Sequence, residues 1–210
     1  YNFVDLKNFT SYMSDKQQRK IDRLNERASD KNKELVLNYN IVNHPVKTVD
    51  TGYIFLGEAY YPTYYTITTN NGYATYFDGF FYTHGVIAKF DKEGNLVWDN
   101  SFELAPDYKP MKLKKFISIG ANDKMVDLSF GNLKELFYKQ IDAESGNVLL
   151  NDVNEIIDTK LDGDKIRRSF SDVSFWYKNY FIAHGSQIVT NKGEDRKRTI
   201  FFVNKIKLDK

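Results

Sequence analysis

The chain has three histidines, the side chains best suited to acid–base or metal chemistry near neutral pH: His44, His84 and His184. Thr83-His84-Gly85 resembles Ala183-His184-Gly185, so two of the histidines are equivalent if the chain repeats. No carboxylate pattern near them supplies a ligand set or a proton relay. The sequence favours histidines hydrogen-bonded at strand ends, with a metal or general-base site as the alternative.

Other reactive groups are missing from the sequence. With no cysteine, the chain has no disulfide, no thiolate nucleophile and no cysteine metal site. It contains no hydrolase elbow, phosphate loop, dinucleotide fingerprint or zinc-helix motif. Asp91–Asn95 and Asp162–Asp164 lack the alternating ligands and terminal Glu of a calcium loop, which favours simple turns. We therefore predict a non-enzyme with no catalytic residue, metal or cofactor.

Aromatic side chains are the best candidates for binding, and they crowd the segment from Tyr60 to His84. Tyrosine combines a rigid apolar ring with a hydrogen-bonding tip, which suits protein interfaces and sugar stacking. Alternatively, the rings pack on one another and cover their own sheet. The predicted recognition surface is Tyr60, Tyr61, Tyr64, Tyr65, Tyr73, Tyr76 and Phe81, with the first and last at the base and Tyr64, Tyr73 and Tyr76 near the tip.

A long hairpin is expected to carry these rings. Asn71-Gly72 is a strong two-residue hairpin signal, and the surrounding threonines favour extended backbone. With those two residues as the loop, Asn70 faces Tyr73, Ile67 faces Tyr76, and Thr66 faces Phe77.

The flanking segments predict antiparallel β-structure. Gly52–Ala59 alternates like a half-buried strand, and Val86–Phe90 runs into a turn at Asp91–Asn95 in which Gly94 takes positive φ. Leu136–Leu150 aligns with Val86–Trp98 with one inserted residue. We expect a mainly β chain of antiparallel meander repeats, a partial β-propeller-like array. Its units span about 42–105, 111–157 and 169–208. In the second unit, Lys124–Phe130 corresponds to Tyr53–Ala59 of the first. The strands of the third unit are Asn179–Gly185 and Thr199–Ile206, and Asp158–Arg168 is the linker before it.

Residues 1–41 are expected to form a separate N-terminal segment. Tyr1–Phe9 is a short strand or anchor, and Thr10 or Ser11 caps a helix that continues to about Leu35. The helix has a thin apolar stripe and two rows of opposite charge, with pairs such as Arg19/Asp22. It is a surface helix or a docking element for another chain.

The net charge of the chain and the length of its apolar runs restrict the kinds of partner that we expect. A net charge of +2 over 210 residues argues against a dedicated nucleic-acid binder, and no apolar run is long enough to span a bilayer. Acidic residues dominate between Asp50 and Asp107, whereas the tail after Lys192 is basic. The chain begins at Tyr1, so we expect a processed part of something longer, and the lack of cysteine fits an extracytoplasmic protein.

Four pieces of sequence, YPTY, FDGFFYTHG, FDKEGNLVWDNSFE and FFVNKI, resemble uncharacterised cell-envelope proteins of the Bacteroidetes, particularly flavobacteria. The likeness covers about Val42–Lys207. It implies a periplasmic, secreted or cell-surface location and a β-repeat scaffold, although three units are too few to close a propeller. The resemblance implies no catalytic residue.

These observations together predict a non-catalytic binding or scaffold protein, a subunit or accessory of a cell-envelope assembly such as a partner or plug of a secretion channel. The competing hypothesis is a carbohydrate-binding module that stacks glycans on the tyrosine hairpin.

Overall fold

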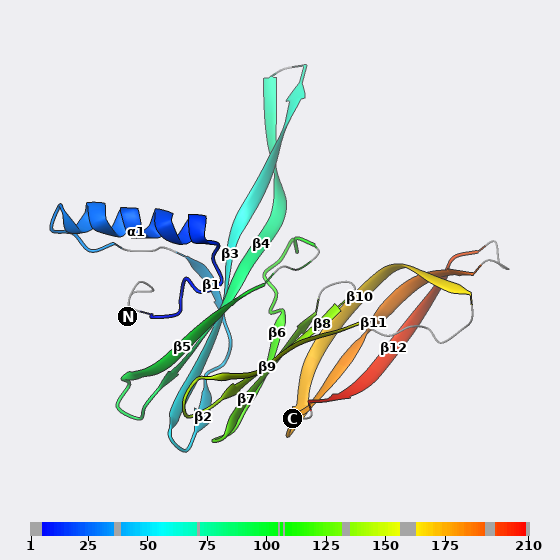
Figure 1. The fold of residues 1–210 in the computed structure, drawn as a ribbon. Helices are drawn as coiled ribbons and strands as arrows, with labels where there is room; N and C mark the ends of the chain where they lie inside the picture. Colours follow the sequence, from blue (N-terminus) through cyan, green and yellow to red (C-terminus); the bar gives the residue numbers. More distant parts are fainter. Residues whose placement is uncertain are drawn as a thin grey trace. The chain divides into compact units, whose positions relative to one another are not determined.

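A computed structural model describes residues 6–35, 39–70, 72–104, 106, 108–131, 135–155, 163–191 and 196–208. The chain forms two compact units, Tyr1–Lys114 and Lys115–Lys210 (Figure 1). The described residues are mainly β, with antiparallel sheets and one helix, as the sequence predicts. The helix belongs to the first unit.

The first unit contains one five-stranded antiparallel sheet. Its strands are β1 (Asn40–Asn43), β2 (Lys47–Val49), β3 (Gly52–Thr69), β4 (Gly72–Phe90) and β5 (Leu96–Glu103). They follow the order β1-β3-β4-β5, and β2 pairs with the start of β3. Ile54, Leu56, Val86 and Ile87 are buried in its core. The predicted Gly52–Ala59 strand is therefore confirmed, although β3 continues ten residues further, to Thr69.

The N-terminal residues anchor on β5. The backbone N–H groups of Lys7 and Asn8 donate to the Asp99 carboxylate at 3.0 and 2.7 Å. Ser101 Oγ donates to the carbonyl of Phe9 at 2.9 Å, and the Phe9 ring is buried. Residues 7–12 are turns, so the predicted helix start at Thr10 or Ser11 is wrong.

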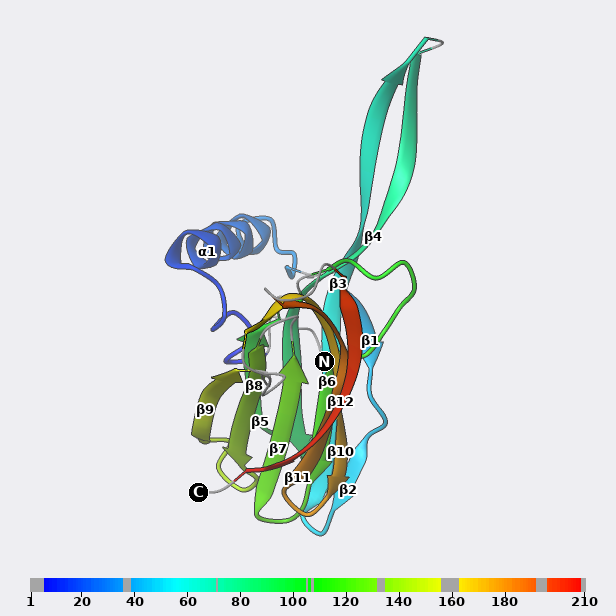
Figure 2. The same cartoon turned by 90° about the vertical axis from the view of Figure 1, so that its right-hand side faces the viewer.

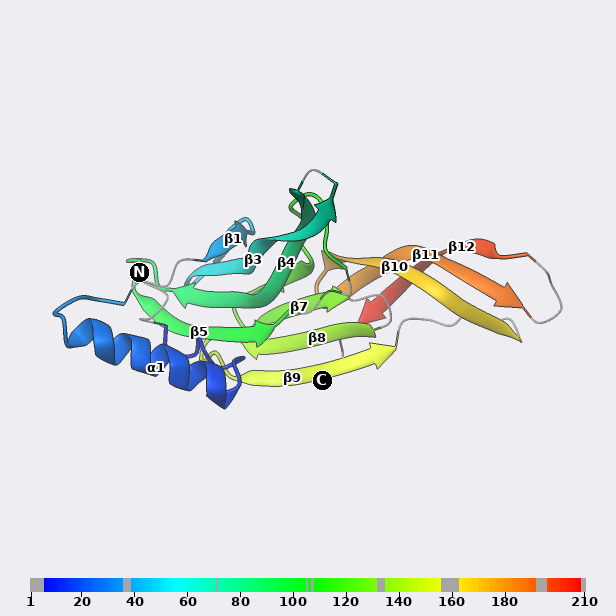
Figure 3. The ribbon, with the colours of Figure 1, turned by 90° about the horizontal axis from the view of Figure 1, so that it is seen from above.

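Helix α1 runs from Asp15 to Ser29, beside the first sheet and well short of the hairpin tip (Figures 1 and 3). Its N-cap is Ser14, whose N–H and hydroxyl both donate to Gln17 Oε1. It ends before the predicted Leu35, and Asn32 then takes a positive φ of 51°. No α1 side chain is buried, which confirms a surface helix. The predicted Arg19/Asp22 pairing does not form, since no ion pair of the described residues involves α1.

The second unit contains two antiparallel sheets. One comprises β6 (Ile117–Ala121), β7 (Met125–Gly131), β8 (Glu135–Asp142) and β9 (Val148–Glu155); the other comprises β10 (Asp164–Tyr177), β11 (Tyr180–Asn191) and β12 (Arg198–Lys207). Their shared core includes Leu136 and Tyr138 from β8 and Phe181 and Ala183 from β11. The prediction that Asp158–Arg168 is a linker is wrong from Asp164 onward, because Asp164 starts β10 and binds Arg198.

The two aligned turns are alike. Each joins the last two strands of its sheet, β4 to β5 and β8 to β9. Gly94 and Gly146 have φ of 87° and 74°, which confirms positive φ at Gly94. Each turn begins with an aspartate, Asp91 or Asp142, whose side chain accepts backbone N–H groups of its own turn. A register shift follows each turn at the same place in the hairpin, so both local geometry and sequence repeat.

Candidate functional site

The outer part of the β3–β4 hairpin projects beyond the first sheet (Figure 2). Strand β1 pairs with β3 only as far as Tyr60, and β5 pairs with β4 only from His84 onward. Between these positions β3 and β4 pair only with each other among the described strands. We call residues 60–83 the arm; its long aromatic hairpin is the one expected from the sequence.

A segment that follows β5 holds the base of the arm. Phe80 N–H donates to the Pro110 carbonyl at 2.9 Å, and Lys109 Nζ lies 2.5 Å from Asp78 Oδ2. Tyr82 is buried, and its hydroxyl donates to the Lys114 carbonyl at 2.6 Å. Gly79, with φ of 92°, has no room for a side chain, because a Cβ there would lie 2.9 Å from Lys109 atoms. The base of the arm is therefore fixed to its unit.

The register at the tip differs from the prediction. Thr69 pairs with Gly72, Thr66 with Thr75, and Tyr65 with Tyr76, so from Tyr64 to Thr69 each residue of β3 faces a partner two positions earlier than expected. Asn71 itself lies outside the described residues. Two threonine hydrogen bonds stabilise this register: Thr66 Oγ1 to Thr75 Oγ1, and Thr69 Oγ1 to the Gly72 carbonyl, each 3.0 Å. A shift of two residues keeps every side chain on its predicted face.

One face of the arm carries a continuous series of aromatic contacts. From the base outward, successive ring centroids are 5.7 Å apart for Tyr82–Tyr60, 5.4 Å for Tyr60–Phe80, 5.0 Å for Phe80–Phe77 and 5.7 Å for Phe77–Tyr64. Exposure rises from 1% at Tyr82 to 61% at Tyr64. The last three of these contacts are edge to face, and such pairs contribute about 0.5–1.5 kcal/mol each beyond their buried area. The contacts connect the tip rings to the fixed base.

The other face carries two cross-strand pairs. The centroids of Tyr61 and Phe81 are 5.3 Å apart, and those of Tyr65 and Tyr76 are 5.6 Å apart, with Ile67 beyond them. All five side chains are 40–50% exposed. Of the seven predicted binding residues, only Tyr60 is half-buried; Tyr73, beside the turn, is 82% exposed. Both faces of the arm therefore present aromatic rings.

The arm also lacks charge outside its base, where Asp78 pairs with Lys109. No Asp, Glu, Lys, Arg or His occurs from Tyr60 to Phe77, in a chain that is 28% charged. A solvent-facing ribbon ordinarily carries charged side chains, since they keep exposed strands from associating. Exposed apolar surface without charge is instead typical of a surface that another molecule covers.

The histidines lie in different environments. His44 Nε2 lies 2.6 Å from Glu58 Oε1, with both side chains buried. His84 is completely buried; its Nδ1 lies 2.8 Å from Thr83 Oγ1, and its ring stacks on Tyr12 with centroids 4.0 Å apart. The His184 side chain is exposed on β11 and its ring has no hydrogen-bond partner among the described residues, so the predicted strand-end hydrogen bond is wrong there.

The described side chains form no candidate site for a metal ion or for calcium. In the part of the chain that the structure describes, no group of three or more His, Asp or Glu side chains is arranged to hold a metal ion. Both oxygens of the Asp91 carboxylate accept hydrogen bonds from Asn95, which lower the Asp91 pKa. Of the other suspected loop, Asp162 lies outside the described residues and Asp164 binds Arg198 and Asn191. No described helix is long and apolar enough to cross a membrane.

The interactions that hold the arm were not predicted. The Asp78–Lys109 ion pair and the Tyr82–Lys114 hydrogen bonds join residues about thirty positions apart, and the sequence signals neither. No protein-family model matches the chain, and comparison with curated proteins and with solved structures finds no match.

Proposed function

We propose that the chain is a non-catalytic binding protein whose arm inserts into a groove of a partner protein. The observation that carries this proposal is the exposure of aromatic rings on both faces of a two-stranded ribbon that has no charged side chain from Tyr60 to Phe77. A partner groove covers both faces, whereas a flat partner surface covers one. Tyrosine anchors suit such an interface because they bury a large area at a small entropic cost.

The fixed base adds support for this function. A two-stranded hairpin alone is marginally stable in water, so a free arm would lose conformational entropy on binding. Here the Pro110 and Lys114 contacts fix the base, and the ring contacts extend that order toward Tyr64. A preorganised arm gives up less entropy when its partner closes around it.

A glycan is the second candidate ligand. Tyr65 and Tyr76 lie within 24° of parallel on one face, and Tyr61 and Phe81 lie within 35°. Such rings offer a platform on which a sugar could stack. The rings of the opposite face meet edge to face, at 63–87° except for Tyr60–Tyr82, and offer no such plane. We therefore prefer the protein partner.

The partner is best sought in the cell envelope. The resemblance of the sequence to flavobacterial envelope proteins is the reason for this choice, with an extracytoplasmic location and a secretion-channel assembly as the working hypothesis. The repeated β4–β5 and β8–β9 turns are consistent with a repeat of the propeller-blade kind, which is part of the same proposal.

The test is site-specific crosslinking with matched variants. A photoreactive phenylalanine at Tyr65 is expected to crosslink one protein from envelope extract. Tyr64→Ser, Tyr73→Ser and Tyr76→Ser together should abolish that product while shifting the melting temperature little, because these rings are 46–82% exposed. The control is Phe201→Ser with Val203→Ser, which removes two apolar side chains from β12 that are 84% and 74% exposed.

Three results decide between the candidates. Normal crosslinking by the triple variant would overturn the proposal. Equal loss in the control variant would make the effect non-specific. Binding to a glycan array that depends on Tyr65 and Tyr76, with no protein product, would favour the carbohydrate function.

A further inference from the structure

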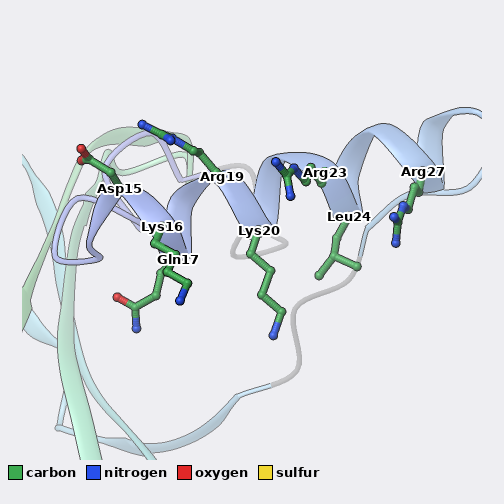
Figure 4. Close-up of a pocket in the computed structure, with 8 residues that line it drawn as sticks. All are labelled: Asp15, Lys16, Gln17, Arg19, Lys20, Arg23, Leu24 and Arg27. Atoms are coloured by element: carbon green, nitrogen blue, oxygen red, sulfur yellow. The ribbon is translucent and has the colours of Figure 1, made fainter.

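Helix α1 presents a second surface, and its chemistry is the opposite of the arm's. Five cationic side chains line an open groove of about 840 Å³ along the helix, together with Asp15, Gln17 and Leu24 (Figure 4). The five cations are Lys16, Arg19, Lys20, Arg23 and Arg27. All are exposed, and Leu24, in their midst, is 38% exposed. We call them the cationic face.

The cationic face has no partner within the described chain. None of its five side chains makes an ion pair or side-chain hydrogen bond with a described residue. Arg19, Arg23 and Arg27 follow one another at four-residue spacing, where like charges destabilise a helix by a few tenths of a kcal/mol each. Repulsion within the row therefore opposes helix formation, although Arg27, in the last turn, also interacts favourably with the helix dipole.

The spacing of the arginines matches a narrow anionic ligand. Four residues of α-helix rise about 6 Å, so the three arginine Cα atoms lie at regular steps of that length. Carboxylates at alternate positions of an extended peptide repeat at nearly the same distance, about 6.4–6.8 Å. The planar guanidinium group also binds carboxylates through two parallel hydrogen bonds.

The neighbouring residues disfavour a broad polyanion. Asp22 and Glu26 each follow an arginine by three positions, so they occupy the adjoining strip of the same helix. A membrane surface or a nucleic-acid duplex would cover both strips and be repelled by these carboxylates. Residues 1–114 also carry equal numbers of acidic and basic side chains, so the first unit has no net positive charge to attract such a polyanion.

We propose that the cationic face of α1 binds an acidic segment of a partner protein. The segment carries carboxylates at alternate positions and an apolar side chain that rests on Leu24. This contact is independent of the arm, because it uses charge and a different element.

The test measures binding of a fluorescein-labelled twelve-residue poly-glutamate peptide to the full chain by fluorescence anisotropy. Saturable binding that weakens as NaCl rises from about 50 to 300 mM is expected. The variant Arg19→Gln, Arg23→Gln, Arg27→Gln should bind roughly tenfold more weakly, since each exposed charge pair contributes a modest amount. Glutamine is a good helix former, so α1 should persist, which circular dichroism checks.

A matched control removes the same charge elsewhere in the unit. Lys33→Gln, Lys92→Gln and Lys112→Gln neutralise three exposed lysines outside the cationic face and should leave peptide binding unchanged. Equal weakening in this control, or no peptide binding by the native chain, would overturn the proposal. So would arginine-dependent binding to vesicles with 30% phosphatidylglycerol, or to duplex DNA, that is tighter than peptide binding.

Discussion

Protonation of His84 should destabilise the first unit as the pH falls below neutrality. The His84 ring is fully buried among Phe9, Tyr12 and Tyr39, whose ring centroids lie 4.0–5.3 Å away. Its Nε2 has no hydrogen-bond partner among the described residues. Burial lowers the pKa of His84 from 6.5 to about 4, and burial also raises the pKa of Tyr12 and Tyr39, so neither supplies a negative charge.

The direction of this pH dependence follows from the proton uptake of the folded and unfolded states. Below pH 6.5 the unfolded chain binds a proton at His84, whereas the folded chain does so only near pH 4. The folded state is therefore at its full stability above about pH 6.5 and loses free energy as the pH falls through that window. The loss is about 2 kcal/mol at pH 5 and approaches roughly 3 kcal/mol near pH 4.

Urea unfolding followed by Trp98 fluorescence measures this loss. Trp98 lies in β5 of the first unit, so a Trp176→Phe background removes the tryptophan of the second unit. His84→Phe keeps an aromatic ring in the stack but cannot titrate. Between pH 7 and 5 the free energy of unfolding of the native protein should fall by about 2 kcal/mol more than that of the His84→Phe variant. The same pH dependence in both proteins would refute the reasoning.

Three further predictions concern stability. Gly94→Val should lower the free energy of unfolding by roughly 1 kcal/mol or more in urea titration, because valine tolerates the φ of 87° poorly. Replacing residues 15–29 with a short flexible linker should barely change the melting temperature, whereas a chain that begins at Leu35 should melt lower, because it also lacks the buried Phe9 anchor. Asp99→Ala leaves the Lys7 and Asn8 N–H groups without their acceptor and should cost about 1–3 kcal/mol by thermal denaturation.

Local signals in the sequence predicted much of the first sheet. Asp91 and Gly94 specify their turn by side-chain hydrogen bonding and positive φ, both properties of single residues. The alternation of Ile54, Leu56 and Glu58 identified one face of β3, and all three side chains are buried. Such features depend on neighbours a few positions away.

Features that depend on distant residues were not predicted. Residues 7–9 bind Asp99 and Ser101, about ninety positions away, and no local pattern contains that information. The N-cap at Ser14, by contrast, has a local signal in its capping box with Gln17, which the predicted cap at Thr10 or Ser11 overlooked. The tip register follows from threonine and aromatic pairs that outweigh the preference of Asn-Gly for the loop. The candidate site was found by composition, but its fixed base requires contacts with residues 109–114.

The arm and the cationic face allow binding to be dissected by salt. Burial of the arm's uncharged rings should resist increasing ionic strength, since apolar burial does not depend on screened charges. Contacts of Arg19, Arg23 and Arg27 should weaken over the same range, because these side chains are exposed. A partner that uses both surfaces should therefore retain a salt-resistant component that Tyr64→Ser, Tyr73→Ser and Tyr76→Ser together remove. The salt-sensitive component of its binding should disappear in the Arg19→Gln, Arg23→Gln, Arg27→Gln variant. A partner whose binding responds to neither set of substitutions uses some other surface.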